Sequence, residues 1–198
     1  MRNAYILREQ GGKPQRVVAM FQRFRFREVP AANIRRLYGV IVAQARTPAF
    51  YADFGVPDTI EGRYDMVVLH VYLVFRRLAQ AGEAARAAGQ QMFDLFIEDM
   101  DASVRELGVG DLSVPRKVRA MAEAYFGRTQ AYDAALAAAE DASLAAALTR
   151  NVYAGSGEGD ALRLARYARL AEAQLAALDA GAIEEGNFTF PDPGEVRP

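Results

Sequence analysis

The sequence of 198 residues contains no cysteine, no tryptophan and a single histidine. Without cysteine the chain cannot form a disulfide, a thiolate metal site or a cysteine nucleophile, so cysteine usage does not indicate a compartment. One histidine excludes, within a single chain, any catalytic or metal site that needs two imidazoles. These absences remove several classes of enzyme, but they do not favour any one function.

Long apolar runs are also missing. The densest one, residues 66–75, contains His70 and is followed by Arg76 and Arg77. A membrane-spanning helix needs about 20 apolar residues, so we interpret this run as part of the core and expect no integral membrane segment. The first residues lack an apolar stretch before a small-residue cleavage site, which predicts that the protein is not secreted.

Charge is distributed unevenly along the chain, although the net charge is only −1. Residues 1–46 contain ten Arg or Lys and two Glu, whereas residues 47–198 contain fourteen and twenty-three acidic residues, for net charges of +8 and −9. We interpret residues 1–30 as a basic N-terminal arm. Within it, arginine alternates with phenylalanine at Arg23, Phe24, Arg25, Phe26 and Arg27.

This alternation has three interpretations. Arginine neutralises phosphate and phenylalanine stacks on exposed bases, so the arm could bind RNA. The same residues could lie on an anionic membrane surface, with the rings entering the interface. The third interpretation is a solvated arm that has no partner. The alternation alone does not choose among them.

Beyond the arm, apolar residues recur at spacings of three and four, which predicts helices. The first begins with Asn33 as its N-cap and is limited by Pro48, and a buried helix over residues 65–78 follows a cap at Asp58 or Thr59. A third covers residues 84–107, with Phe93, Ile97, Met100, Val104 and Leu107 on its inner face and glycines at its end. Alternating strand patterns are missing from the sequence.

The second half continues in the same way. Ser113 caps a helix with Val118, Met121, Tyr125, Tyr132 and Leu136 inward, Leu144 to Val152 mark another, and Asp160 caps a last one closed by Gly181. We therefore predict an all-α fold: a compact single-domain bundle of about six or seven helices over residues 31–182. Residues 183–198 are predicted to be extended or disordered, with Phe188 and Phe190 docking on the bundle.

Candidate catalytic groups are few. His70 lies in an apolar helix, which favours a hydrogen-bonded core histidine over a catalytic one, and no Gly-x-Ser-x-Gly elbow presents a nucleophile. Asp94, Glu98, Asp99 and Asp101 fall on two helical turns, and a solvated acidic face is favoured over a surface that docks a partner. Asp101 and Arg105 are spaced for an i,i+4 ion pair. The residues predict no catalytic site, no metal and no cofactor.

Several motifs nevertheless resemble a known family. They occur in order as QARTPAFY at residues 44–51, GVPDT at 55–59, GRYDM at 62–66, LH at 69–70, FD at 93–94, DMD at 99–101, RELGVGD at 105–111 and GRTQAY at 127–132. This succession, over about residues 36–136, resembles the ubiquinol–cytochrome c chaperone family. The likeness covers half of the chain.

The resemblance implies an assembly factor that is not an enzyme. Mitochondrial members assist assembly of respiratory complex III, work with a small partner protein near the ribosomal tunnel exit, and bind newly made cytochrome b. The resemblance also implies a cytoplasmic protein peripheral at the inner membrane of a bacterium, or a matrix protein in a mitochondrion. Its polar motif residues become candidate client-binding or partner-binding residues: Arg63, Asp65, Asp94, Asp99, Arg105, Asp111 and Arg128.

Two further expectations complete the functional hypothesis. A helical chaperone would hold an apolar client segment in a groove between helices, and several candidate residues would pair with each other, Arg63 or Arg105 with Asp65 or Asp99. Two alternatives from other classes stay open. One is a helical enzyme that acts on a lipid or isoprenoid substrate, and the other is a basic-armed RNA-binding module.

Overall fold

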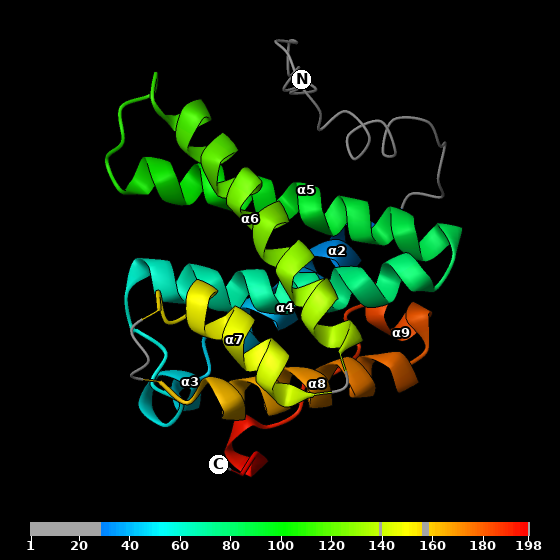
Figure 1. Cartoon of the computed structure of the whole chain (residues 1–198). Coiled ribbons are helices and arrows are strands. Elements are labelled where there is room, and N and C mark those ends of the chain that lie inside the picture. The colour runs from blue at the N-terminus through cyan, green and yellow to red at the C-terminus, as the bar shows by residue number, and fades with distance from the viewer. Residues whose placement is uncertain (1–28, 139, 156–158, 198) are drawn as a thin grey trace.

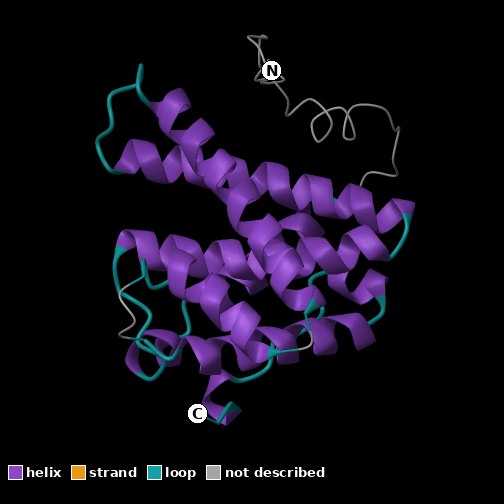
Figure 2. Cartoon of the chain, in the orientation of Figure 1, coloured by secondary structure: helices purple, strands orange, loops and turns teal. Residues whose placement is uncertain are grey.

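The computed structural model describes residues 29–138, 140–155 and 159–197. Within these ranges the regular elements are all helices, which confirms the predicted all-α class (Figures 1 and 2). Six are eleven residues or longer: α2 Ala31–Ala45, α4 Ile60–Gln80, α5 Glu83–Glu106, α6 Val114–Ala137, α7 Asp141–Asn151 and α8 Ala161–Ala177. The short elements are α3 Pro48–Ala52, α9 Ala180–Glu184 and the 3-10 turn η1 Pro193–Glu195. Among the described residues, none of the helices is long and apolar enough to cross a bilayer.

Helix starts agree with the predicted caps at two of the long helices. Thr59 Oγ1 accepts a hydrogen bond from the Gly62 backbone at 3.1 Å, and Asp160 Oδ1 accepts one from Arg163 N at 2.8 Å. The predicted cap at Asn33 is wrong. Helix α2 begins two residues earlier because the carbonyl of Pro30 already accepts a hydrogen bond from the Asn33 N–H at 2.8 Å. Asn33 therefore lies inside the first turn.

Helix α4 runs through the middle of the bundle, between α5 and α8 (Figure 1). Nearly every side of it is covered, since α2, α5, α6, α8 and α9 all contact it. This explains why residues 65–78 show apolar residues without a clear polar face, as expected for a buried helix. The predicted helix over this run is confirmed.

Helices α5 and α6 form a long hairpin whose turn is at the upper left of Figure 1. The buried stripe of α5 contains Met92, Phe96, Met100 and Val104. Leu107 was predicted to face inward, and this is wrong: it follows the last helical residue and is 55% exposed. The positive φ of +76° at Gly108 ends the helix at the predicted place.

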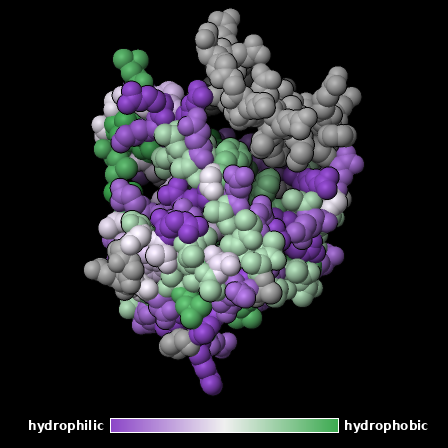
Figure 3. Space-filling model, viewed as in Figure 1, coloured by the Kyte–Doolittle hydropathy of each residue, from purple (hydrophilic) through white to green (hydrophobic). Residues whose placement is uncertain are grey.

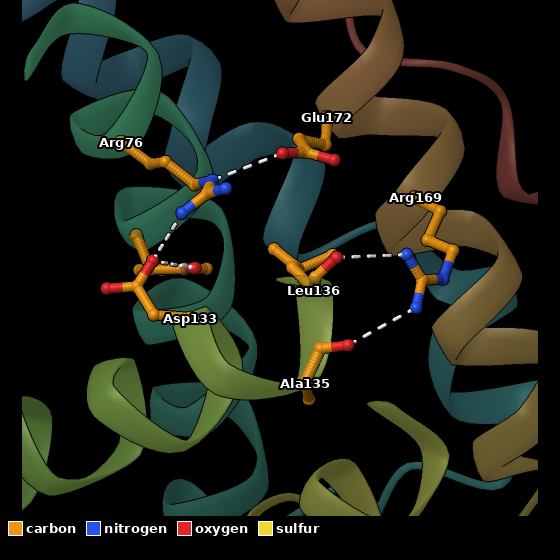
Figure 4. A network of polar contacts seen from close by, with 7 residues as sticks. Arg76, Asp133, Ala135, Leu136, Arg169 and Glu172 are labelled. Carbon is orange, nitrogen blue, oxygen red and sulfur yellow. Dashed lines mark hydrogen bonds and ion pairs between the residues drawn. The ribbon is translucent and has the colours of Figure 1, made fainter. Parts of the chain in front are cut away.

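Arginine side chains tie the opposite part of the bundle together. Arg76 of α4 contacts both Asp133 of α6 at 2.5 Å and Glu172 of α8 at 3.1 Å (Figure 4). Arg169 of α8 donates to the carbonyls of Ala135 and Leu136 at the end of α6, at 3.3 and 3.4 Å. Carbonyls in the last turn of a helix have no partner within the helix, so Arg169 closes that end of α6.

The C-terminal segment follows α9 and packs on the bundle. Phe190 is 7% exposed and belongs to the core, and Phe188 packs beside it with ring centroids 5.4 Å apart, which confirms the docking predicted for both rings. Gly186 has a φ of +68°, and a Cβ atom on it would lie 2.7 Å from the Leu37 amide nitrogen. Only glycine allows this close approach of the segment to α2.

Candidate binding groove

A groove of about 610 Å³ lies between the N-terminal half of α4 and the α5–α6 hairpin. We call it the hairpin groove. Most of its surface is apolar. Exposed or half-buried side chains line it at Ile60, Tyr64, Val67, Leu107 and Met121, together with the buried Phe96, Met100 and Val104. The half-buried Met121 gives this surface an adaptable shape, because an unbranched thioether side chain has many conformations. The groove is therefore suited to an apolar ligand or segment.

Charged residues surround this apolar surface, and most of them are cations. Arg46, Arg63, Lys117 and Arg128 line the groove together with two carboxylates, those of Glu61 and Asp99. Asp99 already accepts a hydrogen bond from Tyr38 Oη at 2.8 Å. Burial, and after it this hydrogen bond, raise the pKa of the Tyr38 phenol. Among the described residues, Arg46 and Lys117 have no ion-pair partner. Arg63 and Arg128 are neutralised by Asp58 and Asp65, so Arg46 and Lys117 are the lining cations that can meet an anionic group.

A buried ion pair lies directly behind the groove wall. Asp65 of α4, 5% exposed, contacts Arg128 of α6 at 2.8 Å. Burial raises the pKa of Asp65 to about 6, in spite of the opposing effect of Arg128. Arg128 also lies over the Tyr64 ring, 5.7 Å from its centroid. Because these contacts fix Arg128 between α4 and α6, they set the spacing of the two groove walls.

The predicted pairing of Arg63 or Arg105 with Asp65 or Asp99 is wrong. Arg63 contacts Asp58 at 2.6 Å, on the loop immediately before α4. Arg105 contacts Asp101 at 2.6 Å, which confirms the predicted i,i+4 pair, and it also contacts Asp111 at 2.9 Å. Local partners win because they are only four to six residues away along the chain, and holding them together costs little chain entropy.

The candidate residues are therefore divided between the groove and its surroundings. Arg63, Asp99 and Arg128 line the groove, and Asp65 lies behind its wall. Arg105 and Asp111 are at the hairpin turn, and Asp94 is exposed on α5, where it accepts a hydrogen bond from Gln90 at 2.7 Å. The arm residues Arg23, Phe24, Arg25, Phe26 and Arg27 lie outside the described residues.

His70 lies far inside the bundle and takes no part in the groove. Its Nδ1 is 2.7 Å from the Met66 carbonyl, which can only accept, so Nε2 accepts from Tyr167 Oη at 2.8 Å. Complete burial lowers the pKa of His70 to about 4 and keeps the ring neutral. This confirms the interpretation of a hydrogen-bonded core histidine. Among the described residues, no group of three or more potential metal ligands is present.

Sequence reasoning did not select Arg46, Lys117 or Met121 as site residues, although it placed Met121 on an inner helix face. Tyr64 Oη donates to the Met121 carbonyl at 3.1 Å, which joins the two walls. Arg46 lies inside the first recognised motif, but the motif does not show that Arg46 lines a groove together with residues of α4, α5 and α6. Lys117 belongs to no motif. Its place in the groove follows from the packing of α6 on α4 and could not be predicted from the sequence.

Comparison with known proteins agrees with the motifs. The family described as ubiquinol-cytochrome C chaperone matches residues 52–190. The chain belongs to the ubiquinol–cytochrome c chaperone family. The match contains the α5–α6 hairpin and all of the groove residues except Tyr38 and Arg46.

The chain is also similar to a solved structure and to curated vertebrate proteins. The crystal structure of the Cbp3 homolog from Brucella abortus is 39% identical, with a TM-score of 0.79 over 85% of this chain and 94% of that chain. Ubiquinol-cytochrome-c reductase complex assembly factor 1 of Xenopus laevis is 26% identical over 117 residues, 59% of this chain and 58% of that protein. The corresponding mouse protein is 25% identical over 118 residues, 60% of this chain and 40% of that protein. The chain thus spans about half the length of these curated relatives.

Proposed function

We propose that this chaperone-family member assists assembly of the ubiquinol–cytochrome c reductase complex by holding newly made cytochrome b in the hairpin groove. The vertebrate relatives are named as assembly factors of that complex, which supports a role of this chain in the assembly. The apolar groove is the observation that carries the proposal, because it supplies a place for an apolar segment of the client.

The chemistry of such a client fits the groove. A membrane protein that has not yet been assembled exposes apolar helices, and burial of apolar surface is favourable without any directed bond. Met121 allows different side chains to be accommodated, and Arg46 and Lys117 can meet carboxylate or phosphate groups beside the apolar segment. Binding and release then need no covalent step, so the proposal requires no catalytic residue or cofactor.

Location and further partners are part of the same proposal. We place the protein in the cytoplasm, peripheral at the inner membrane of a bacterium, where nascent cytochrome b emerges, or in the matrix of a mitochondrion. The basic arm would contact the ribosome or the anionic membrane surface, since phosphate attracts its arginines. A small partner protein stays a prediction from the resemblance.

Crosslinking in cells tests the identity of the client. A photoreactive phenylalanine analogue replaces Met121 in the groove or, as a control, Leu170, which is 47% exposed on α8. We expect cytochrome b among the proteins captured from position 121 and not from position 170. Equal capture from both positions, or capture of other proteins alone from position 121, would contradict the proposal.

A charge substitution tests whether the groove is needed for assembly. We expect Met121→Glu to lower the assembled reductase at least about tenfold, since a carboxylate would be desolvated against the client. Leu170→Glu is the matched control and should leave assembly unchanged. Folding of both variants is checked by denaturant unfolding. Wild-type levels of the complex with folded Met121→Glu would exclude the groove as the client site.

The enzyme alternative makes a different prediction for the same groove. Its volume is within the range of small-molecule pockets, but its carboxylates are the separate side chains of Glu61 and Asp99, and Asp99 is held by Tyr38. Thermal stabilisation of the protein by an isoprenoid diphosphate with Mg²⁺, abolished in Met121→Glu, would favour the enzyme over the chaperone.

A further inference from the structure

The turn of the α5–α6 hairpin exposes leucine side chains to solvent. We call residues 105–119, which contain the turn and its flanking helix ends, the hairpin tip. Leu112 is 100% exposed and Leu107 is 55% exposed. The tip projects at the upper left of Figure 1, and hydrophobic side chains gather there in Figure 3. A fully exposed leucine at the end of a projecting hairpin contributes nothing to the core.

Local contacts hold this leucine away from the bundle. Arg105 contacts both Asp101 and Asp111, at 2.6 and 2.9 Å, which braces the turn immediately before Leu112. Gly108 has a φ of +76°, and a Cβ atom added to Gly108 or Gly110 would meet nothing within 4 Å. Residues 110–113 of the turn are exposed, and the chain is buried again only at Val114.

The charge of the hairpin tip is opposite to that of the body. Residues 47–198 have a net charge of −9, whereas residues 105–119 contain four cations and two carboxylates, for a net charge of +2. The carboxylate of Asp111 is already paired with Arg105. Among the described residues, Arg116 and Lys117 have no ion-pair partner, and both are in the first turns of α6, immediately after Leu112. Positive charge and exposed apolar surface thus coincide.

We propose that the hairpin tip docks on an anionic lipid bilayer. Leu112 enters the boundary between headgroups and acyl chains, while Arg116 and Lys117 contact lipid phosphate. The hairpin tip is convex, so its projecting leucine can insert only into a surface that deforms around the side chain. A lipid bilayer deforms in this way more readily than the surface of a folded protein does. Apolar insertion and cation–phosphate contact together make reversible, salt-sensitive binding.

Docking at the tip also orients the hairpin groove. Leu107 and Lys117 belong to both the tip and the groove lining, so the groove opens beside the docked surface. The acidic residues of α5 between Asp94 and Asp101 are farther along the hairpin, away from the tip. An anionic surface would therefore repel the body and attract the tip. The docking itself does not depend on which client the groove holds.

A fluorescent label at the tip tests this inference directly. The full chain has no cysteine, so Leu112→Cys can be labelled at a single position with an environment-sensitive nitrobenzoxadiazole dye. We expect a blue shift of its emission with vesicles of phosphatidylglycerol and phosphatidylcholine, and quenching by nitroxide-labelled lipid. Phosphatidylcholine alone should give neither change. Leu170→Cys on α8, carrying the same dye, is the matched control and should not respond.

Vesicle co-sedimentation separates the tip from the basic arm. Leu112→Gln and Arg116→Glu should each lower the partition of the full chain several-fold, and Leu170→Gln should leave it unchanged. Anionic vesicles that bind the protein while the label at position 112 stays silent would overturn the proposal, as would failure to bind at all. A label that responds to an acidic protein but not to vesicles would also overturn it. Crosslinking from Met121 is independent of these outcomes, so failure of the proposed function can be recognised separately.

Discussion

The two sides of α4 differ in how their polar groups are satisfied. On one side lie α2, α8 and the C-terminal segment, and we call this side the base. Polar atoms in the base are hydrogen-bonded to other protein atoms: Gln44 Nε2 donates to Tyr167 Oη at 3.0 Å and to the Pro191 carbonyl at 3.1 Å. Towards the hairpin, apolar side chains and the cations Arg46 and Lys117 line an open groove. A hydrogen-bond network whose groups all have partners specifies one packing of the side chains. Exposed apolar surface, in contrast, can still gain free energy by binding a partner.

The comparison predicts the largest loss of stability in the base. His70→Ala would remove a fully buried ring that packs against Phe50 and Phe190, with centroids 5.6 and 5.0 Å away. It would also leave Tyr167 Oη without its acceptor. We expect the free energy of unfolding to fall by about 4 kcal/mol, from the cavity and the lost hydrogen bond together. Denaturant unfolding of the purified chain measures it.

If His70→Ala changed client binding, the base and the groove could not be treated as separate parts of the molecule. Folded His70→Ala should capture the same partner from position 121 as the unsubstituted chain does. Leu170→Ala, an exposed site on the same side as His70, should change the free energy of unfolding by less than about 0.5 kcal/mol. A loss below about 1 kcal/mol for His70→Ala would show that the network around it is dispensable.

The ion pair behind the groove wall predicts a pH dependence. Burial raises the pKa of Asp65 from 3.8 to about 6, so the folded chain holds this proton more tightly than the unfolded chain does. The stability contributed by the protonated group is present at low pH and is lost as the pH rises from about 4 to 6. Asparagine does not titrate, so Asp65→Asn should gain about 3 kcal/mol relative to the native chain between about pH 3 and 7.

An exposed carboxylate provides a control of opposite sign. The hydrogen bond from Arg63 lowers the pKa of Asp58, so its contribution appears as the pH rises and is lost in acid. Relative to the native chain, Asp58→Asn should therefore lose stability as the pH rises. Denaturant unfolding of the native chain, Asp65→Asn and Asp58→Asn over the same pH series measures both trends. A difference for Asp65→Asn that is constant with pH would contradict the raised pKa.

Much of the fold could be predicted because local signals and the final packing agree. Thr59 and Asp160 are caps by their side-chain chemistry, and the buried run of residues 65–78 requires a covered helix. The errors lie at the ends of helices, where the apolar pattern gives little guidance. Pro30 moved the start of α2, and the exposed position of Leu107 depends on the end of α5 lying beside an open groove.

The site was less predictable than the fold. Three of the motif residues, Arg63, Asp99 and Arg128, line the groove from α4, α5 and α6, and their role in binding stays a prediction. Their partners could not be read from the pattern, because the Asp65–Arg128 pair joins residues of different helices. Spacing along one helix identifies i,i+4 pairs such as Asp101–Arg105, but a contact between helices depends on how the helices cross.

The smallest expected effect is at the hairpin turn, and it sharpens the contrast with the base. Asp111→Ala removes the 2.9 Å contact to Arg105, but Asp111 is 89% exposed and Arg105 keeps Asp101. We expect the free energy of unfolding to change by less than about 0.5 kcal/mol, since water solvates both charges. Unfolding measured at low and high salt checks this. A loss comparable to that of His70→Ala would mean that the turn supports the whole bundle, and the hairpin could then not be treated as a separate binding element.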